Sequence, residues 1–161
     1  MQPPSSDGAL RIQMTLGDAF RVLEFEQSTH TSAEAAAAIG CDVAQIAKSM
    51  LFKAADGTPV LVVASRTNRV DDRKIAALLG QKVSRADAAF VLERTGFAVG
   101  GVPPVGHATT PVTFLDRDLQ RYSTIWAAAG SPSAVFALTP ADLARLTGAG
   151  FVDVAKGAKA E

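Results

Sequence analysis

The segment SMLFKAADGTPVLVVAS, residues 49–65, contains two apolar runs separated by the pair Asp56-Gly57. Residues 49–54 and 59–65 are rich in side chains that favour strands, and an Asp-Gly pair between two such runs is typical of a β-hairpin turn. The first prediction is therefore an antiparallel hairpin near the middle of the chain. The elements predicted on either side indicate that this hairpin belongs to a larger sheet.

Clear helix signals surround the hairpin. Thr31-Ser32-Ala33-Glu34 forms a capping box, in which the threonine oxygen accepts an N–H of the first turn and the glutamate reaches back, and Gly40 is a typical stop. Caps and apolar spacing predict further helices at residues 9–16, 42–47, 71–80, 86–95 and 139–148. Short strands are predicted at residues 20–25, 112–115, 124–128, 134–138 and 151–154. This order of elements predicts a single α+β domain built on a curved mixed sheet.

The length and composition fit one globular domain. The chain has 161 residues, of which 48% are hydrophobic and 20% are charged, enough for a real core. Its sixteen basic and sixteen acidic residues cancel, which argues against broad coating of nucleic acid and, without a recognition helix, against a DNA-binding regulator. A local contact with RNA stays open. The folded domain is expected at residues 9–155, with flexible ends at 1–8 and 156–161.

The cysteine count and hydropathy bear on the compartment. Cys41 is the single cysteine, so the chain can form neither an internal disulfide nor a thiolate zinc site, and a reducing compartment fits best. No apolar run approaches the roughly 20 residues that span a bilayer, and the first residues lack the pattern of a secretory signal. We therefore expect a cytoplasmic protein with no membrane contact.

The stretch Gly100-Gly101-Val102-Pro103-Pro104-Val105-Gly106-His107 indicates a shaped backbone loop. Proline fixes φ and glycine permits close approach of a ligand, so such a loop can present a rigid wall of peptide groups. Lys48 lies between the helix predicted at 42–47 and the strand that begins at Ser49, and it can point into the same cleft. The alternatives are a solvated lysine at a helix end and a loop that is only a rigid connection.

Other polar and aromatic residues have less specific interpretations. The histidines, His30 and His107, are more typical of structural or surface positions than of a catalytic base, and no G-x-S-x-G elbow is present. Trp126 is more typical of a core or cleft wall than of a base-stacking platform. The densest basic patch is either a solvated helix face or a phosphate guide for a tRNA acceptor stem. It consists of Arg66, Arg69, Arg73 and Lys74, with Asp71 and Asp72 among them.

Four segments in order along the chain carry a family resemblance. They are TSAEAA leading to IAKSMLF in residues 31–52, ASRTNRV at 64–70, GGVPPVGH at 100–107 and WAAAGSP at 126–132. Together they resemble the YbaK family, the free-standing relatives of the editing domain inserted in bacterial prolyl-tRNA synthetases. The resemblance covers about residues 20–154.

The resemblance implies a compact domain with a barrel-like mixed sheet flanked by helices. It also implies a deacylase that hydrolyses mischarged aminoacyl-tRNA in trans, with no metal and no organic cofactor. The expected substrate is tRNA-Pro carrying a small amino acid such as alanine or cysteine, and the expected partners are the tRNA acceptor end and an aminoacyl-tRNA synthetase. The alternative is a non-catalytic module that binds tRNA ends or regulates a synthetase.

The resemblance also assigns site residues. It gives the functional role to Lys48 and a pocket-lining role to the loop 100–107. We expect Lys48 to hold the ester carbonyl or a nearby phosphate, and the backbone N–H groups of Gly100 and Gly101 to stabilise the tetrahedral oxygen. The residues expected to contact substrate are Thr31, Ser49, Asn68, Pro103, Gly106, His107, Gly130 and Ser131. Whether Phe25 supplies the pocket aromatic found in many relatives stays open.

Overall fold

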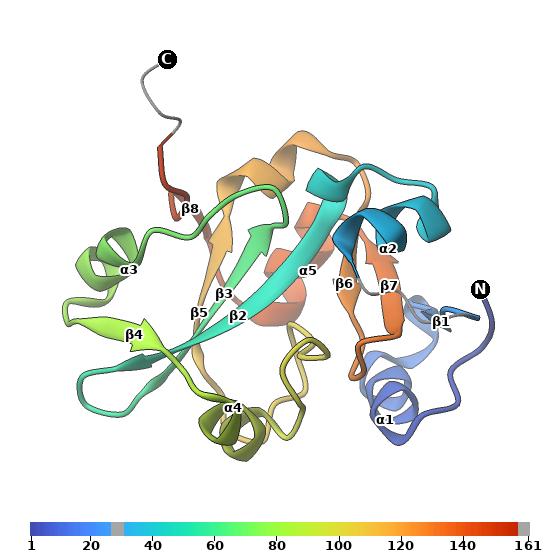
Figure 1. Ribbon diagram of the computed structural model, residues 1–161, viewed down its shortest axis with the longest axis horizontal. Coiled ribbons are helices and arrows are strands. Elements are labelled where there is room, and N and C mark those ends of the chain that lie inside the picture. Colours follow the sequence, from blue (N-terminus) through green and yellow to red (C-terminus); the bar gives the residue numbers. More distant parts are fainter. Residues whose placement is uncertain (27–30, 158–161) are drawn as a thin grey trace.

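The predicted hairpin forms the centre of the structure, a computed structural model that describes residues 1–26 and 31–157 (Figure 1). The strands of this part of the chain are β1 (Val22–Glu24), β2 (Ile46–Ala54), β3 (Pro59–Ser65), β4 (Val83–Arg85), β5 (Val112–Asp116), β6 (Ile125–Ala128), β7 (Ala134–Leu138) and β8 (Phe151–Val152). They form one mixed sheet in the order β1-β7-β6-β2-β3-β5-β8, and β4 pairs with β2 outside this path. The α+β class is confirmed, and the sheet does not close into a barrel.

Helices cover the sheet, and α2, α3 and α5 begin at the predicted caps, whereas α1 begins two residues before its predicted start and α4 two residues after it. They are α1 (Asp7–Leu16), α2 (Ser32–Ile39), α3 (Asp72–Leu79), α4 (Ala88–Thr95) and α5 (Pro140–Thr147). The Thr31 hydroxyl oxygen accepts the N–H of Glu34 at 3.0 Å, as the capping box predicts. In Figure 1, α5 lies behind the sheet and α2 lies in front of β6 and β7. None of the helices in the described ranges is long and apolar enough to cross a membrane.

One predicted helix is wrong. Val43–Gln45 form only a single 3-10 turn, η2, and β2 begins at Ile46. Ile46 and Ala47 pair with β6, and Ala47 also pairs with β3. The sheet overrides the helix tendency of this alanine-rich segment because neighbours on both sides pair with it. Lys48 therefore lies inside a strand and not at a junction between a helix and a strand.

The two edges of β2 are paired differently. One edge pairs with β3 from Ala47 to Lys53. The other edge pairs in parallel with β6 only at Ile46 and Ala47, and antiparallel with β4 only at Phe52–Ala54. Lys48–Leu51 therefore lie in a split between β6 and β4, where no strand of the described residues pairs with this edge.

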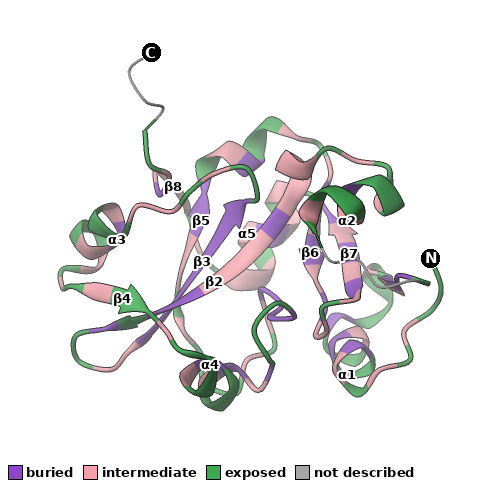
Figure 2. Ribbon diagram, viewed as in Figure 1, coloured by how far each residue is buried: buried purple, intermediate pink, exposed green. Residues whose placement is uncertain are grey.

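The central strand β3 separates two hydrophobic cores. Leu61 and Val63 point into the larger core, which also contains residues of α1, α4 and α5. Val60 and Val62 point to the opposite face and join a smaller core with Ile75 of α3. All four strand residues are fully buried, and Figure 2 shows β3 buried along its length. The hairpin is thus held firmly from both faces.

The first residues, for which the sequence predicts a flexible end, contact β1. Gln2 pairs with Glu24, and the backbone N–H and hydroxyl of Ser5 donate to the Glu24 carboxylate at 2.5 and 2.7 Å. Burial raises the pKa of Glu24, but hydrogen bonds from Ser5 and Ser6 outweigh burial and leave the pKa below its ordinary value. The segment is therefore anchored. Most of the tail predicted to be flexible, residues 158–161, lies outside the described residues.

Candidate active site

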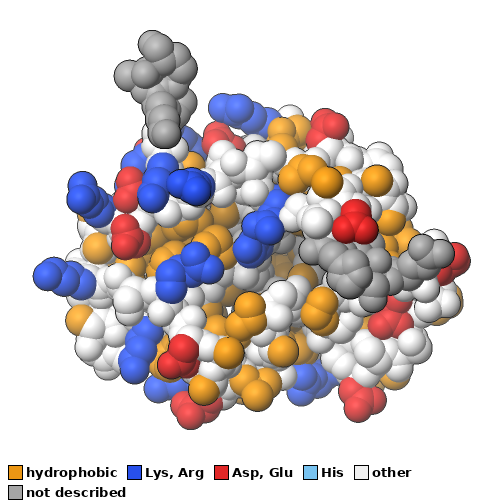
Figure 3. Space-filling model, in the orientation of Figure 1, with side chains coloured by type: hydrophobic (Ala, Val, Ile, Leu, Met, Phe, Trp, Pro, Cys, Tyr) orange, Lys and Arg blue, Asp and Glu red, His pale blue; other side chains and the backbone are white. Residues whose placement is uncertain are grey.

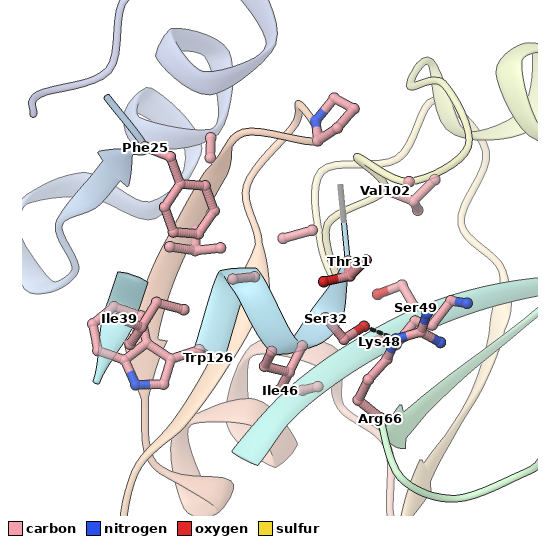
Figure 4. A pocket seen from close by; sticks show the side chains of 17 residues that line it. Phe25, Thr31, Ser32, Ile39, Ile46, Lys48, Ser49, Arg66, Val102 and Trp126 are labelled. Carbon is pink, nitrogen blue, oxygen red and sulfur yellow. Dashed lines mark hydrogen bonds between the residues drawn. The ribbon is translucent and has the colours of Figure 1, made fainter. Parts of the chain in front are cut away.

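Lys48 lines three neighbouring cavities, which makes it the centre of the candidate site. The first cavity, of about 240 Å³, opens between α2 and strands β2, β6 and β7, and we call it the apolar pocket (Figure 4). Its walls are mostly apolar side chains, among them Phe25, Ala35, Ile39, Ile46, Val102, Trp126, Ala128 and Val135. The split in the sheet thus opens into a space fit for a small apolar group.

The apolar pocket has an apolar end and a charged end. Figure 4 shows Phe25, Ile39 and Trp126 at one end and Lys48 and Arg66 at the other. The prediction that Trp126 forms a cleft wall is confirmed. Phe25 is 7% exposed and also lines the pocket, which answers the question that the sequence left open.

The charged end places Lys48 among other cations. Burial lowers the pKa of Lys48, and the charges of Arg66 and Arg85 lower it further. Arg66 is held in place because its Nε donates to the hydroxyl of Ser32, at the first turn of α2. A partly buried ammonium in this position favours contact with an electron-rich oxygen or an anion.

Ser49 also faces the pocket and carries an unsatisfied hydroxyl. Its Oγ is buried and has no hydrogen-bond partner among the described residues. It lines both the apolar pocket and a smaller cavity of about 80 Å³ next to Gly100. A buried polar atom without a partner is costly, so this hydroxyl is available to a bound ligand. Thr31 lines the pocket too, but its hydroxyl serves the helix cap.

The glycine–proline loop divides into two parts. Gly100 and Val102 line the apolar pocket. No described residue accepts a hydrogen bond from the Gly100 N–H, whereas the Gly101 N–H donates to the Ala98 carbonyl at 3.1 Å. Gly101 is therefore not a free oxyanion donor, and the expected catalytic role for its N–H does not fit the geometry.

The second part of the loop turns away from the pocket. Pro103 and His107 are joined by a contact of 2.6 Å between the Pro103 carbonyl oxygen and the imidazole Nε2. Gly106 packs against α1, because a Cβ there would lie 2.9 Å from Ile12 Cδ1. None of these three loop residues lines the apolar pocket. Their predicted substrate contacts are not supported, and His30 lies outside the described residues.

Gly130 and Ser131 lie behind the pocket and support it. The Gly130 N–H donates to the Gly101 carbonyl at 3.0 Å. A Cβ on Gly101 would lie 2.8 Å from the Cα of Ser131, so only glycine allows these two backbones to approach so closely. The neighbouring Pro132 lines the pocket. Gly130 and Ser131 therefore hold the pocket wall in position but do not line the pocket, so their predicted contacts with substrate are not supported.

The basic patch predicted from the sequence separates into two groups. Lys74 forms an ion pair with Asp153 at 2.9 Å and serves the fold. Arg66 and Arg69 instead line a second cavity beside Lys48, together with Asn68. Asn68 donates through its Nδ2 to two carboxylates, of Asp116 and Asp118, at 2.8 Å each. Its role in the structure is that of a brace.

Sequence reasoning missed Arg85 and Ser32. Arg85 ends β4, a three-residue strand without an apolar pattern, so nothing local marked it. Ser32 stands inside the capping box, where its hydroxyl had no predicted use. Among the described residues, no group of three His, Cys, Asp or Glu side chains could hold a metal ion.

A comparison with known protein families shows which family this chain belongs to. Residues 26–146 match the family described as the aminoacyl-tRNA editing domain. The chain belongs to this family. The match includes α2, all of β2 and the loop 100–107, the elements that surround Lys48. It confirms the resemblance to the YbaK family and, at the level of the family, the class of ester hydrolase that the resemblance implies.

Individual relatives agree with this assignment. The chain is 36% identical over 126 residues to "Uncharacterized protein YwhH" of Bacillus subtilis (strain 168), covering 78% of this chain and 80% of the relative. It is 28% identical over 138 residues to "Putative Cys-tRNA(Pro)/Cys-tRNA(Cys) deacylase EbsC" of Enterococcus faecalis, covering 84% of each. A solved structure titled "Crystal structure of a putative trans-editing enzyme for prolyl tRNA synthetase" superposes with a TM-score of 0.91 at 43% identity, covering 96% of this chain and 100% of the other.

Proposed function

We propose that this protein hydrolyses, in trans, the ester of a mischarged tRNA, with tRNA-Pro carrying alanine or cysteine as the expected substrate. The observation that supports this most is the position of Lys48, at the charged end of an apolar pocket of about 240 Å³. The names of the Enterococcus relative and of the structural neighbour support the choice of tRNA-Pro. The reaction is expected in the cytoplasm, where charged tRNA is used.

The chemistry needs few groups. An aminoacyl ester is already activated, so hydrolysis requires mainly a positioned water and stabilisation of the oxyanion. In the proposed mechanism the Lys48 ammonium polarises the ester carbonyl and the Gly100 N–H is the second donor. The Ser49 hydroxyl binds the water, whose oxygen attacks the carbonyl carbon. The bond between that carbon and the ribose oxygen then breaks, the ribose oxygen takes up a proton from the water, and the free amino acid and the tRNA are released. A preorganised donor of this kind contributes about 3 kcal/mol to lowering the barrier.

The apolar pocket accounts for the expected preference for small side chains. Phe25, Ile39 and Trp126 close its far end. A synthetase gains only about 1–3 kcal/mol of discrimination from one methylene group, so small amino acids escape its first selection. A second site that admits only small side chains removes these errors.

A panel of mischarged tRNAs tests this function. Purified protein should release alanine or cysteine from tRNA-Pro faster than the spontaneous rate and leave large aliphatic or aromatic amino acids in place. Lys48→Ala should lose this release and keep its fold. Binding without release would indicate the tRNA-end-binding module instead. Adding prolyl-tRNA synthetase tests the expected partner, because association of the two proteins should change the rate of release.

A further inference from the structure

A second cavity, of about 400 Å³, lies beside the apolar pocket, and we call it the basic cavity. Lys48, Met50 and Phe52 line it because alternate residues of β2 share one face of the sheet. Lys48 and Arg66 line both cavities, so a ligand held at Lys48 can extend into each. The inference below rests on the proposed function.

The basic cavity carries an excess of unpaired positive charge. Its cations are Lys48, Arg66, Arg69, Arg85 and Lys156, and its one lining carboxylate is that of Asp72. None of the five cations forms an ion pair with a carboxylate of the described residues, although Lys74 nearby does. Figure 3 shows Lys and Arg side chains gathered from the left edge to the centre of this face, around a hydrophobic strip. A chain with no net charge thus concentrates free cations here.

These cations are close enough to repel one another. The pKa of Lys48 is lowered by burial and then by Arg66 and Arg85. A bound anion would relieve this repulsion, whereas a metal cation would increase it. The arginines and Lys156 are exposed, so an anion can reach them from solvent.

Hydrogen bonds within the protein hold the backbone around the basic cavity. The Lys156 N–H donates to the Arg69 carbonyl at 2.8 Å, and Val70 pairs with Ala155. Asn68 braces the segment between Arg66 and Arg69 by donating to the carboxylates of Asp116 and Asp118. The floor is apolar because Met50 and Phe52 form it. Basic side chains on a held backbone, around an apolar floor, fit a nucleotide backbone.

We propose that the basic cavity binds the phosphodiester groups that precede the terminal nucleoside of a single-stranded RNA 3′ end, with Arg66, Arg69 and Arg85 contacting the phosphates. If the aminoacyl ester lies at Lys48 with its side chain in the apolar pocket, the ribose and its 5′ phosphate must leave on the other side. The basic cavity is on that side. Arginine suits this role because its planar donor group binds phosphate oxygens in pairs.

Binding of RNA without any aminoacyl group tests the cavity directly. The probe is a six-nucleotide single-stranded RNA that ends in CCA and carries a fluorophore at its 5′ end, followed by fluorescence anisotropy between about 50 and 200 mM salt. Arg69→Ala combined with Arg85→Ala should weaken binding about tenfold. The slope of log affinity against log salt should fall by about 0.7 for each lost phosphate contact. Arg69→Lys with Arg85→Lys should restore most of the slope.

Arg21→Ala is the matched control, because Arg21 is exposed and lines none of the three cavities. Equal affinity and slope for the double alanine variant and this control would overturn the proposal. Competition by inorganic phosphate as strong as that by the RNA would also overturn it, because the site would then bind any anion.

A kinetic experiment separates this inference from the proposed function. On mischarged tRNA, the double alanine variant should raise KM about tenfold and change KM by a larger factor than kcat. On an aminoacyl ester of adenosine without a 5′ phosphate the same variant should show a much smaller rise in KM, and equal rises in KM on both substrates would overturn the proposal. If wild type releases no amino acid but binds RNA through the arginines, only the proposed function fails. If it deacylates and the arginines do not matter, only the basic cavity fails.

Discussion

The two halves of β2 belong to one strand but have different surroundings. From Leu51 to Ala54 the strand is mostly buried and pairs with β3 on one edge and, from Phe52, with β4 on the other. From Lys48 to Met50 the strand is partly exposed, and its second edge lies in the split between β6 and β4. The part-exposed half, Lys48 to Met50, carries the unsatisfied hydroxyl of Ser49 and the Lys48 ammonium close to two arginines. The buried half, Leu51 to Ala54, has neither.

The difference shows how one strand can be both support and site. The paired half fixes the backbone through two cores, and the unpaired half keeps polar groups available at fixed positions. Polar groups that destabilise the folded state, such as a buried hydroxyl without a partner, persist only where the surrounding structure holds them in place. Stability and activity should therefore respond in opposite ways along β2.

The largest effect is expected for Lys48→Met. It should lower kcat/KM for mischarged tRNA by about 10²–10³-fold, because it removes a preorganised cation from the ester. Lys53→Met is the control on the same strand. The Lys53 ammonium lies 5.2 Å from the centre of the Phe90 ring, and its loss should change kcat/KM by less than about twofold. Similar losses in both variants would remove the contrast between the two halves.

Leu61→Ala tests the support that β3 gives to the buried half of β2. Leu61 lies opposite Leu51 in the hairpin and is fully buried. Its truncation should lower the free energy of unfolding by about 2–5 kcal/mol, measured by urea denaturation, with kcat of the folded fraction unchanged. A selective loss of kcat without loss of stability would show that the core tunes the site directly.

Two serine-to-alanine variants should change the free energy of unfolding in opposite directions. Ser49→Ala removes a buried hydroxyl without a partner, so it should raise the free energy of unfolding by about 1 kcal/mol while lowering kcat about tenfold. Ser65→Ala removes a hydroxyl that donates to the Ala44 carbonyl at 2.7 Å, so it should cost about 1 kcal/mol of stability. Calorimetry checks both, and destabilisation by Ser49→Ala would contradict the assignment of a free hydroxyl.

The smallest expected effect is on the pH dependence of stability. Because the pKa of Lys48 is below 10.5 in the folded protein, the unfolded chain binds more protons between that lowered pKa and 10.5, and stability rises with pH across this window. Lys48→Met lacks this dependence. Its melting temperature should exceed that of wild type near neutral pH, and the difference should shrink towards pH 10.5. A constant difference would show that the Lys48 charge is not strained by the fold.

Local signals explain what the sequence could predict. The hairpin follows from Asp56-Gly57, and the helix starts follow from caps such as Thr31, because both depend on residues close in sequence. The position of Lys48 and the composition of the loop 100–107 predicted that both face one cleft, the family resemblance implied the same, and Lys48 and Gly100 both line the apolar pocket. The family comparison supports that resemblance, while the catalytic role of Lys48 stays a prediction.

Long-range contacts explain what the sequence could not predict. The segment before Lys48 has the composition of a helix, but pairing with β3 and β6 draws it into the sheet. His107 and Gly106 look like loop residues open to substrate, yet contacts with Pro103 and α1 turn them away. Arg85 has no local pattern and reaches the site only because β4 pairs with β2.

The glycine contacts behind the pocket have a consequence for where the working unit ends. The family match starts at residue 26, but a Cβ on Gly130 would overlap the carbonyl oxygen of Gly8, so the start of α1 presses directly on the turn that bears Pro132. Phe25 also precedes the matched range. A fragment trimmed to the match would lose the contact between Gly8 and Gly130 that supports this wall of the apolar pocket, so genetic fusions at the amino end should keep the first helix intact.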